Sequence, residues 1–200
     1  MTVGILLAAG AGSRFGGNKL LASLHGKPLV LYALDALRPA VTEIIAVVRP
    51  GSERLTAVLT QAGARVAICD QAARGMGHSL ACGARLAPAD TNLLIALGDM
   101  PAIASDTIRR VIAALDAGAT IAVPCYRGRR GHPVGFAARL APVLLELTQD
   151  QGARGVLHTY ADAVLDIPVD DPGVLADVDT PADLERESDN FPAGIKGSAE

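Results

Sequence analysis

The chain has 200 residues, a length that is enough for one well-buried domain. Its formal net charge of −3 lacks the basic excess typical of nucleic-acid-binding proteins. Half of the residues are hydrophobic, yet no apolar run approaches the roughly 18 to 20 residues that a membrane-spanning helix needs. We therefore expect a cytoplasmic protein with neither nucleic acid nor membrane as a partner. We expect one domain over residues 1–187 and a flexible tail over residues 188–200, where the apolar periodicity fades.

The first apolar run, Val3 to Leu7, predicts a buried strand, and a loop with four glycines, Arg14 and Lys19 follows it. Glycines remove the side chains that would hold a phosphate away from backbone N–H groups, and the two cations add positive charge. The loop therefore predicts a phosphate site, with a glycine-rich turn carrying two solvated cations as the alternative. Phe15 and Asn18 stand where a dinucleotide fingerprint and a P-loop would need glycine and lysine, so neither motif is present.

Short strands and helices alternate along the rest of the chain. Further strands are predicted at residues 43–48, 65–69, 93–97, 120–124, 134–136 and 164–169. Helices are predicted at residues 27–37, 55–62, 78–86, 105–117, 138–148 and 155–160. This alternation predicts an α/β fold with a mostly parallel sheet covered on both faces. The strand at 134–136 is reached through a loop rather than a helix, so we expect it to be antiparallel.

Acidic residues follow the predicted strands at 93–97 and 164–169. Ligands of such sheets bind outside the carboxyl ends of the strands, so Asp99 is expected to face the ligand. Mg²⁺ prefers one or two carboxylates together with phosphates and water, which makes Asp99 a candidate metal ligand, with a turn or cap aspartate as the alternative. We expect only one of Asp177 and Asp179 to reach the same metal. Residues 180–184 also have the pattern of an ordinary helix start.

Two further loops carry polar residues. Residues 74–79 open a helix, and exposed helix N-termini favour anions or polar ligand edges. Residues 126–133 contain three arginines, which suit a phosphate-bearing second substrate or, alternatively, form a solvated charged turn. His132 in this loop is a candidate general base or a turn-stabilising residue.

With these motifs in the same order, the chain resembles the nucleotidyltransferases of the molybdenum-cofactor type from residue 3 to about residue 186. The matching segments are residues 7–19, 26–28, 75–80, 98–101, 130–134, 152–155 and 177–184. The resemblance implies a three-layer α/β/α domain of Rossmann-like topology. It also implies an Mg²⁺-dependent transfer of a nucleotide monophosphate from an NTP to the terminal phosphate of the phosphorylated pterin cofactor, with release of pyrophosphate.

The resemblance assigns roles to individual residues. The expected nucleotide-binding residues are Leu7, Ala8, Ala9, Gly10, Gly12, Lys19, Gly77 and Ser79. The expected catalytic residues are Arg14, Lys19 and Asp99, the expected metal ligands Asp99 and Asp179, and the expected acceptor-binding residues Arg130, His132 and Arg154. Because the attacking phosphate is already largely a dianion near neutral pH, with a second pKa of about 6, the reaction needs no dedicated general base.

Base choice depends on position 9. The guanylyl branch of this superfamily tends to have glycine there and the cytidylyl branch alanine, so Ala9 favours CTP over GTP because its methyl group narrows the base slot. Residues 69–73 depart from the family pattern, so the resemblance assigns them no base contacts. The alternatives are GTP as donor, a sugar or polyol phosphate as acceptor, a nucleotide-binding oxidoreductase, and a chaperone that delivers cofactor to a molybdenum hydroxylase. Delivery of the product to such a hydroxylase is compatible with the enzymatic role.

Overall fold

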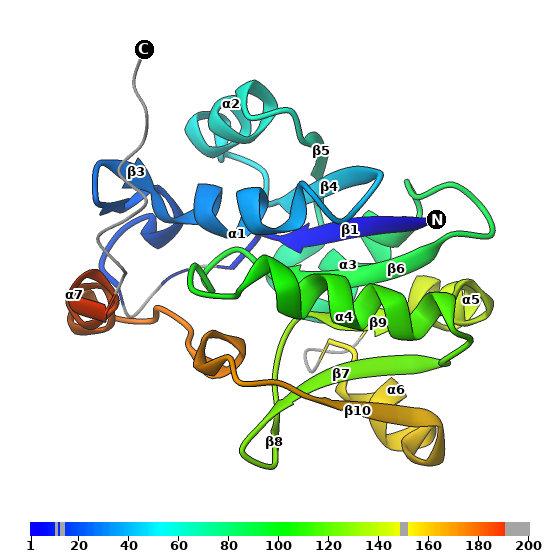
Figure 1. The fold of residues 1–200 in the computed structure, drawn as a ribbon. Helices are drawn as coiled ribbons and strands as arrows, with labels where there is room; N and C mark the ends of the chain where they lie inside the picture. The colour runs from blue at the N-terminus through cyan, green and yellow to red at the C-terminus, as the bar shows by residue number, and fades with distance from the viewer. Residues whose placement is uncertain (11, 13–14, 149–151, 191–200) are drawn as a thin grey trace.

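The computed structural model describes residues 1–10, 12, 15–148 and 152–190 (Figure 1). The strands are β1 (Thr2–Leu7), β2 (Ser23–Leu24), β3 (Lys27–Pro28), β4 (Glu43–Val48), β5 (Arg65–Ile68), β6 (Asn92–Leu97), β7 (Ile121–Tyr126), β8 (Arg129–Arg130), β9 (Val134–Phe136) and β10 (Val164–Pro168). Within the described residues, β2 and β3 form a separate hairpin, and the other strands form an eight-stranded sheet in the order β10-β7-β9-β6-β1-β4-β5, with β8 paired to β7.

Most strand pairs of this sheet are parallel. Strand β1 lies between β6 and β4 and is parallel to both, and β5 continues the sheet in the same direction. Strand β9 is antiparallel to β6 and to β7, which confirms the expected exception at residues 134–136. Because β1, β4, β5 and β6 run the same way, the loops that follow them meet at one edge of the sheet.

Helices cover both faces of the sheet. The α-helices are α1 (Leu29–Leu37), α2 (Glu53–Gln61), α3 (Met76–Ala84), α4 (Ser105–Asp116), α5 (Ala141–Leu145), α6 (Arg154–Thr159) and α7 (Pro181–Asn190). The 3₁₀ helices are η1 (Lys19–Leu21), η2 (Ala72–Arg74), η3 (Ala138–Leu140), η4 (Ala161–Ala163) and η5 (Pro172–Leu175).

Two hydrophobic cores separate these helices into layers. Leu6 of β1 belongs to the core shared with α1, α2 and α4, whereas its neighbour Ile5 belongs to the core shared with α3, α5 and α6. The reason is that successive side chains of a strand point to opposite faces of the sheet. The three-layer α/β/α fold is therefore confirmed.

Most element bounds shift by one or two residues from the sequence-based expectation, and three differences are larger or change the type of element. Residues 27–28 pair with the strand β2, so α1 begins only at Leu29. The helix expected at 138–148 is divided into η3 and α5. Helix α7 continues through residues 188–190, where the sequence predicts the start of the tail, and residues 191–200 lie outside the described part of the chain.

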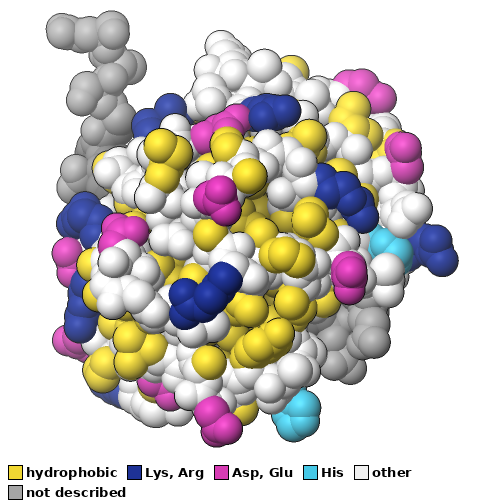
Figure 2. Space-filling model, turned by 90° about the vertical axis from the view of Figure 1, so that its right-hand side faces the viewer, with side chains coloured by type: hydrophobic (Ala, Val, Ile, Leu, Met, Phe, Trp, Pro, Cys, Tyr) yellow, Lys and Arg dark blue, Asp and Glu magenta, His cyan; other side chains and the backbone are white. Residues whose placement is uncertain are grey.

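The surface carries interspersed charges. On the face shown in Figure 2, acidic and basic side chains alternate around hydrophobic side chains that gather near the middle. This face therefore lacks the clustered basic surface that nucleic-acid-binding domains use. None of the helices in the described residues combines the length and the apolar character needed to cross a membrane.

Candidate active site

A cleft of about 660 Å³ opens where the loops after β1, β4, β5 and β6 meet. Its volume lies within the range of small-molecule sites, about 300 to 1,000 Å³. The lining residues are Leu7, Ala9, Gly10, Lys19, Leu20, Arg49, Pro50, Asp70, Ala72, Ala73, Gly75, Met76, Ser79, Leu97 and Asp99. The cleft thus joins the glycine loop, the start of α3 and the segment after β6.

Five of the expected nucleotide-binding residues line this cleft: Leu7, Ala9, Gly10, Lys19 and Ser79. Ala8 is buried, and its N–H donates to the carbonyl of Val47 at 2.8 Å, which extends the pairing of β1 with β4. Gly77 is buried in the first turn of α3. Ala8 and Gly77 therefore do not line the cleft, but they lie next to lining residues and help to position the backbone there.

Gly12 has a structural role in the loop. Its φ is +60°, a left-handed conformation that side chains rarely adopt, and an added Cβ would lie 3.1 Å from the carbonyl oxygen of Gly17. Its carbonyl accepts the N–H of Phe15 at 3.0 Å. The expected phosphate-binding residue Arg14 lies outside the described residues, so its role stays a prediction.

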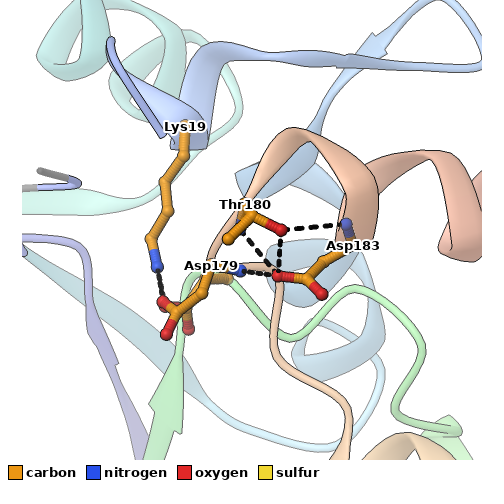
Figure 3. Close-up of polar contacts among 5 residues, drawn as sticks. Lys19, Asp179, Thr180 and Asp183 are labelled. Atoms are coloured by element: carbon orange, nitrogen blue, oxygen red, sulfur yellow. Dashed lines mark hydrogen bonds and ion pairs between the residues drawn. The ribbon is translucent and has the colours of Figure 1, made fainter. Parts of the chain in front are cut away.

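Lys19 contacts two carboxylates, and Figure 3 shows its ammonium pointing toward Asp179. Its ammonium nitrogen is 2.7 Å from Oδ2 of Asp99 and 2.7 Å from Oδ1 of Asp179, which is 160 residues away in sequence. Lys19 is only 8% exposed. Burial by itself lowers the pKa of Lys19, but the hydrogen bonds to Asp179 and Asp99 outweigh it, so the pKa is raised and the group stays positively charged.

The backbone holds these two carboxylates together. The N–H of Gly98 donates to the carbonyl of Leu7 at 3.0 Å, which fixes the segment after β6 beside the glycine loop. The N–H of Val178 donates to the carbonyl of Asp99 at 2.9 Å. The Val178 side chain is fully buried in a small core with Leu24, Leu29 and Tyr32. Val178 therefore anchors the chain so that Asp179 meets Asp99.

Only one of the two candidate acids at 177 and 179 faces the site. Asp177 is exposed, whereas Asp179 contacts Lys19. Residues two apart share a face in a regular strand, but this segment has no strand pairing, so the two side chains diverge. The geometry therefore places Asp179 rather than Asp177 beside Asp99.

The next residues form a helix cap. Oδ2 of Asp183 accepts the backbone N–H groups of Asp179 and Thr180 at 3.1 and 2.7 Å, and the hydroxyl of Thr180 at 2.8 Å. Oγ1 of Thr180 accepts the N–H of Asp183 in return, which is the reciprocal arrangement of a capping box. Residues 180–183 thus start α7 as an ordinary helix, while Asp179, one residue earlier, belongs to the site.

This cap predicts a specific pH dependence of stability. Hydrogen bonds from the Thr180 side chain and backbone lower the pKa of Asp183 from 3.8 to about 2. A lowered carboxyl pKa stabilises the folded state above the unfolded pKa, and this contribution is lost as the pH falls toward the folded value. Above about pH 4, we expect the free energy of unfolding to be larger for wild type than for Asp183→Asn. This difference should disappear as the pH is lowered from about 4 to about 2. Urea unfolding across this range measures it, and a pH-independent difference would contradict it.

Of the three expected acceptor-binding residues, His132 lies close enough to Asp99 and to Arg154 to feel the charge of each. His132 is half-buried before the cis proline Pro133, and burial lowers its pKa, as does the positive charge of Arg154, while the charge of Asp99 opposes them. His132 is therefore a neutral imidazole near neutral pH. Arg130 instead forms a two-point ion pair with Asp166 of β10, with N–O distances of 2.5 and 3.2 Å, so its guanidinium is engaged at the sheet edge.

The His132 loop is packed backbone to backbone. The N–H of His132 donates to the carbonyl of Val174 in η5 at 2.9 Å, and a Cβ added to Gly131 would lie 2.2 Å from that same oxygen. A Cβ on Gly173 would lie 2.2 Å from the carbonyl oxygen of Ala102. Such distances leave no room for any side chain, so both glycines are required by close approach.

Sequence reasoning missed the far wall of the cleft. Arg49, Pro50, Asp70, Ala72 and Ala73 all line it, and all follow β4 or β5. Strand β4 pairs with β1 and β5 pairs with β4, all in parallel. The rule that ligands lie at the carboxyl ends of parallel strands therefore applies to β4 and β5 as well. These residues form no recognisable motif, so the feature that could have identified them is their position directly after a predicted parallel strand.

The carboxylate pair fits a hard divalent cation. In the described residues, no group of three or more His, Cys, Asp or Glu side chains could hold a metal. Asp99 and Asp179 nevertheless converge on one cation, the Lys19 ammonium. Mg²⁺ and similar ions need only one or two carboxylates when phosphates and water complete the shell. The donor set is therefore suitable for such an ion bound together with a nucleotide.

Comparisons with known proteins identify the family of this chain. The model of the MobA-like NTP transferase domain matches residues 4–164. The chain is 31% identical to nicotine blue oxidoreductase of Paenarthrobacter nicotinovorans, covering 92% of this chain and 94% of that protein. It is 34% identical to a probable molybdenum cofactor guanylyltransferase of Thermococcus gammatolerans, covering 68% of each.

A solved structure agrees along almost the whole chain. The manganese complex of Rv0371C from Mycobacterium tuberculosis H37Rv has a TM-score of 0.78 and 28% identity, covering 95% of this chain and 99% of that one. The family match extends from β1 through the glycine loop and the His132 loop to the first residue of β10. This chain therefore belongs to the MobA-like NTP transferase domain family and is a nucleotidyltransferase.

Proposed function

We propose that this protein transfers CMP from CTP to the terminal phosphate of the phosphorylated pterin cofactor in the cytoplasm, releasing pyrophosphate with Mg²⁺ as the divalent ion. The observation that carries the proposal is the convergence of Lys19, Asp99 and Asp179 beside a cleft of nucleotide size. Two relatives support parts of it: one named as a probable molybdenum cofactor guanylyltransferase supports the acceptor, and one solved with manganese supports the use of a divalent ion.

The reaction joins two anions, so the site must first lower their repulsion. An oxygen of the acceptor phosphate forms a bond to the α-phosphorus, and the bond to the bridging oxygen breaks, with its electron pair leaving on pyrophosphate. Arg14 and Lys19 would neutralise the triphosphate, and the glycine loop would let backbone N–H groups approach it. Asp99 and Asp179 would hold the divalent ion, which adds positive charge beside the phosphates.

The acceptor side supplies orientation rather than a base. The acceptor phosphate carries most of its second negative charge near neutral pH, with a second pKa of about 6, so no proton needs to be removed. Arg154 would attract this phosphate, and the neutral His132 would contribute a hydrogen bond without adding charge. The ion pair of Arg130 with Asp166 must open before Arg130 can reach an acceptor.

The proposed preference for CTP over GTP can be tested by substitution of Ala9. Ala9 lines the cleft, so its methyl group limits the width of the base slot, whereas Ala8 is buried and lines no part of it. We expect pyrophosphate release with CTP to exceed that with GTP by about tenfold or more, and Ala9→Gly to narrow the difference, since one methyl group is worth about 1 to 3 kcal/mol in a tight pocket. Release should be measured for four NTPs with and without the pterin cofactor.

Ala8→Gly is the matched control for this experiment. It removes the same methyl group from the buried neighbour and should leave the CTP-to-GTP ratio unchanged. Equal rates for CTP and GTP in wild type, with no change in Ala9→Gly, would contradict the proposed base selection. Pyrophosphate release only with a sugar or polyol phosphate would instead reassign the acceptor.

A relative's name raises a second candidate, nucleotide-dependent redox chemistry. The glycine loop does not follow the dinucleotide pattern, because Phe15 stands at the third glycine position. Titration with NAD(P)H and with flavin separates the two: saturable binding of either would favour the oxidoreductase. A carrier that delivers cofactor to a molybdenum hydroxylase would bind the pterin cofactor without releasing pyrophosphate.

A further inference from the structure

Lys19 sits at the point where the divalent ion of the proposed reaction would be held. We propose that Lys19 is an internal counter-ion, which neutralises Asp99 and Asp179 in the free enzyme and moves to the nucleotide phosphates when the nucleotide arrives with its metal. This inference rests on the proposed function. Its consequence is an order of binding: the free enzyme binds divalent ions weakly, and the ion enters together with the nucleotide.

The geometry of the free site supports this role. The ammonium lies 2.7 Å from an oxygen of Asp99 and 2.7 Å from an oxygen of Asp179, so one positive charge compensates two carboxylates. All three side chains are largely shielded, with exposed fractions of 10%, 21% and 29% for Lys19, Asp99 and Asp179. Shielding strengthens the attraction between the groups, because a charge pair is less screened away from water. The site is thus already filled by a cation of the chain itself.

Lys19 and a divalent ion cannot share these oxygens. A bound Mg²⁺ lies about 2.0 to 2.1 Å from its oxygen ligands. An ammonium at hydrogen-bond distance from the same carboxylates would then meet a doubly positive ion at close range and be repelled. When the ion takes Oδ2 of Asp99 and Oδ1 of Asp179, the ammonium must therefore move away from them.

The side chain can move without a change in the fold. Lys19 begins the short helix η1 and lines the cleft together with Gly10, so its backbone is fixed while the ammonium borders the proposed phosphate site. A lysine carries its charge on a flexible four-carbon stem. Because the triphosphate offers the displaced ammonium a new set of oxygens, nucleotide and metal should each raise the affinity of the other.

The test is Mn²⁺ binding without nucleotide, measured from the electron paramagnetic resonance signal of free Mn²⁺. Lys19→Met removes the charge but keeps a long apolar stem, and we expect it to bind Mn²⁺ about tenfold more tightly than wild type, since a unit charge is lost beside the ligands. Lys27→Met is the matched control, because Lys27 pairs with Asp35 at 2.5 Å outside the cleft. It should bind Mn²⁺ as wild type does.

A second change tests the location of the ion. Adding Asp99→Asn to Lys19→Met should abolish the gain in Mn²⁺ affinity. Unchanged or weaker Mn²⁺ binding in Lys19→Met, or a gain that survives Asp99→Asn, would overturn the counter-ion role. Lys19→Gln, a polar and uncharged variant, gives the same comparison if the methionine variant does not fold.

The failure of this inference can be told apart from the failure of the proposed function. Mn²⁺ binding alone involves neither CTP nor the acceptor, so tight binding in Lys19→Met supports the exchange even if no NTP is turned over. Absence of turnover with all four NTPs would overturn the proposed function alone. In wild type, CTP should raise Mn²⁺ affinity by about tenfold, and an unchanged affinity with bound CTP would overturn the exchange.

Discussion

Asp99→Asn is expected to reduce pyrophosphate release by about a thousandfold or more, because metal stabilisation of phosphoryl charge is worth several kcal/mol and about 1.4 kcal/mol is tenfold in rate. The substitution keeps the size of the side chain and removes its charge. Release is measured with CTP and the pterin cofactor at saturating Mg²⁺. Lys19 keeps its partner Asp179, so the fold should survive, as circular dichroism would show.

Asp177→Asn is the control for this prediction. Asp177 is an exposed aspartate two residues from Asp179, so the variant loses the same charge near the site without losing a contact to Lys19. We expect turnover close to wild type. Near-normal turnover of Asp99→Asn would contradict the metal assignment, and an equal loss in Asp177→Asn would point to a general charge effect.

Gly131→Ala is expected to lower the free energy of unfolding by about 3 kcal/mol, at the upper end of overpacking costs. The added Cβ would lie 2.2 Å from the carbonyl oxygen of Val174 and 2.8 Å from its carbonyl carbon. Because these are backbone atoms, no side-chain rotation relieves the contact. The His132 loop must move away from η5, and turnover should fall with it. Denaturant unfolding measures the loss.

Gly155→Ala is the matched control. Gly155 lies in α6, and nothing lies within 4 Å of the position that its Cβ would occupy. Alanine is favoured over glycine inside a helix by about 0.5 to 1 kcal/mol, so this variant should be slightly more stable than wild type. An unfolding midpoint of Gly131→Ala equal to that of Gly155→Ala would contradict the tight packing.

The α/β fold could be predicted from the sequence because each core strand is a short apolar run that lies between segments with helical periodicity. The antiparallel β9 was predictable too, since a loop cannot make the crossover that a parallel strand requires. Helix extents were less predictable: pairing of residues 27–28 with β2 overrides their helical pattern. Tertiary pairing of this kind is not encoded in the local sequence.

The site was only partly predictable for a similar reason. Because ligands bind at the carboxyl ends of parallel strands, the sequence predicts that the glycine loop and Asp99 lie close together. The same rule does not predict that Lys19 pairs with Asp179, which is 160 residues later. Arg130 was predicted to bind the acceptor, whereas in the structure it is paired with Asp166 of strand β10. Contacts between distant segments depend on register and packing, which single motifs do not specify.

The backbone contacts at Gly131 and Gly173 have a consequence for how acceptor preference can diverge among related enzymes. They join the His132 loop, η5 and the segment after Asp99 into a stack with no side chains between its layers. A longer loop or a bulkier residue there would shift His132 and Asp99 together. A change of acceptor should therefore arise by substitution outside this stack, for example at Arg154, which is exposed at the start of α6.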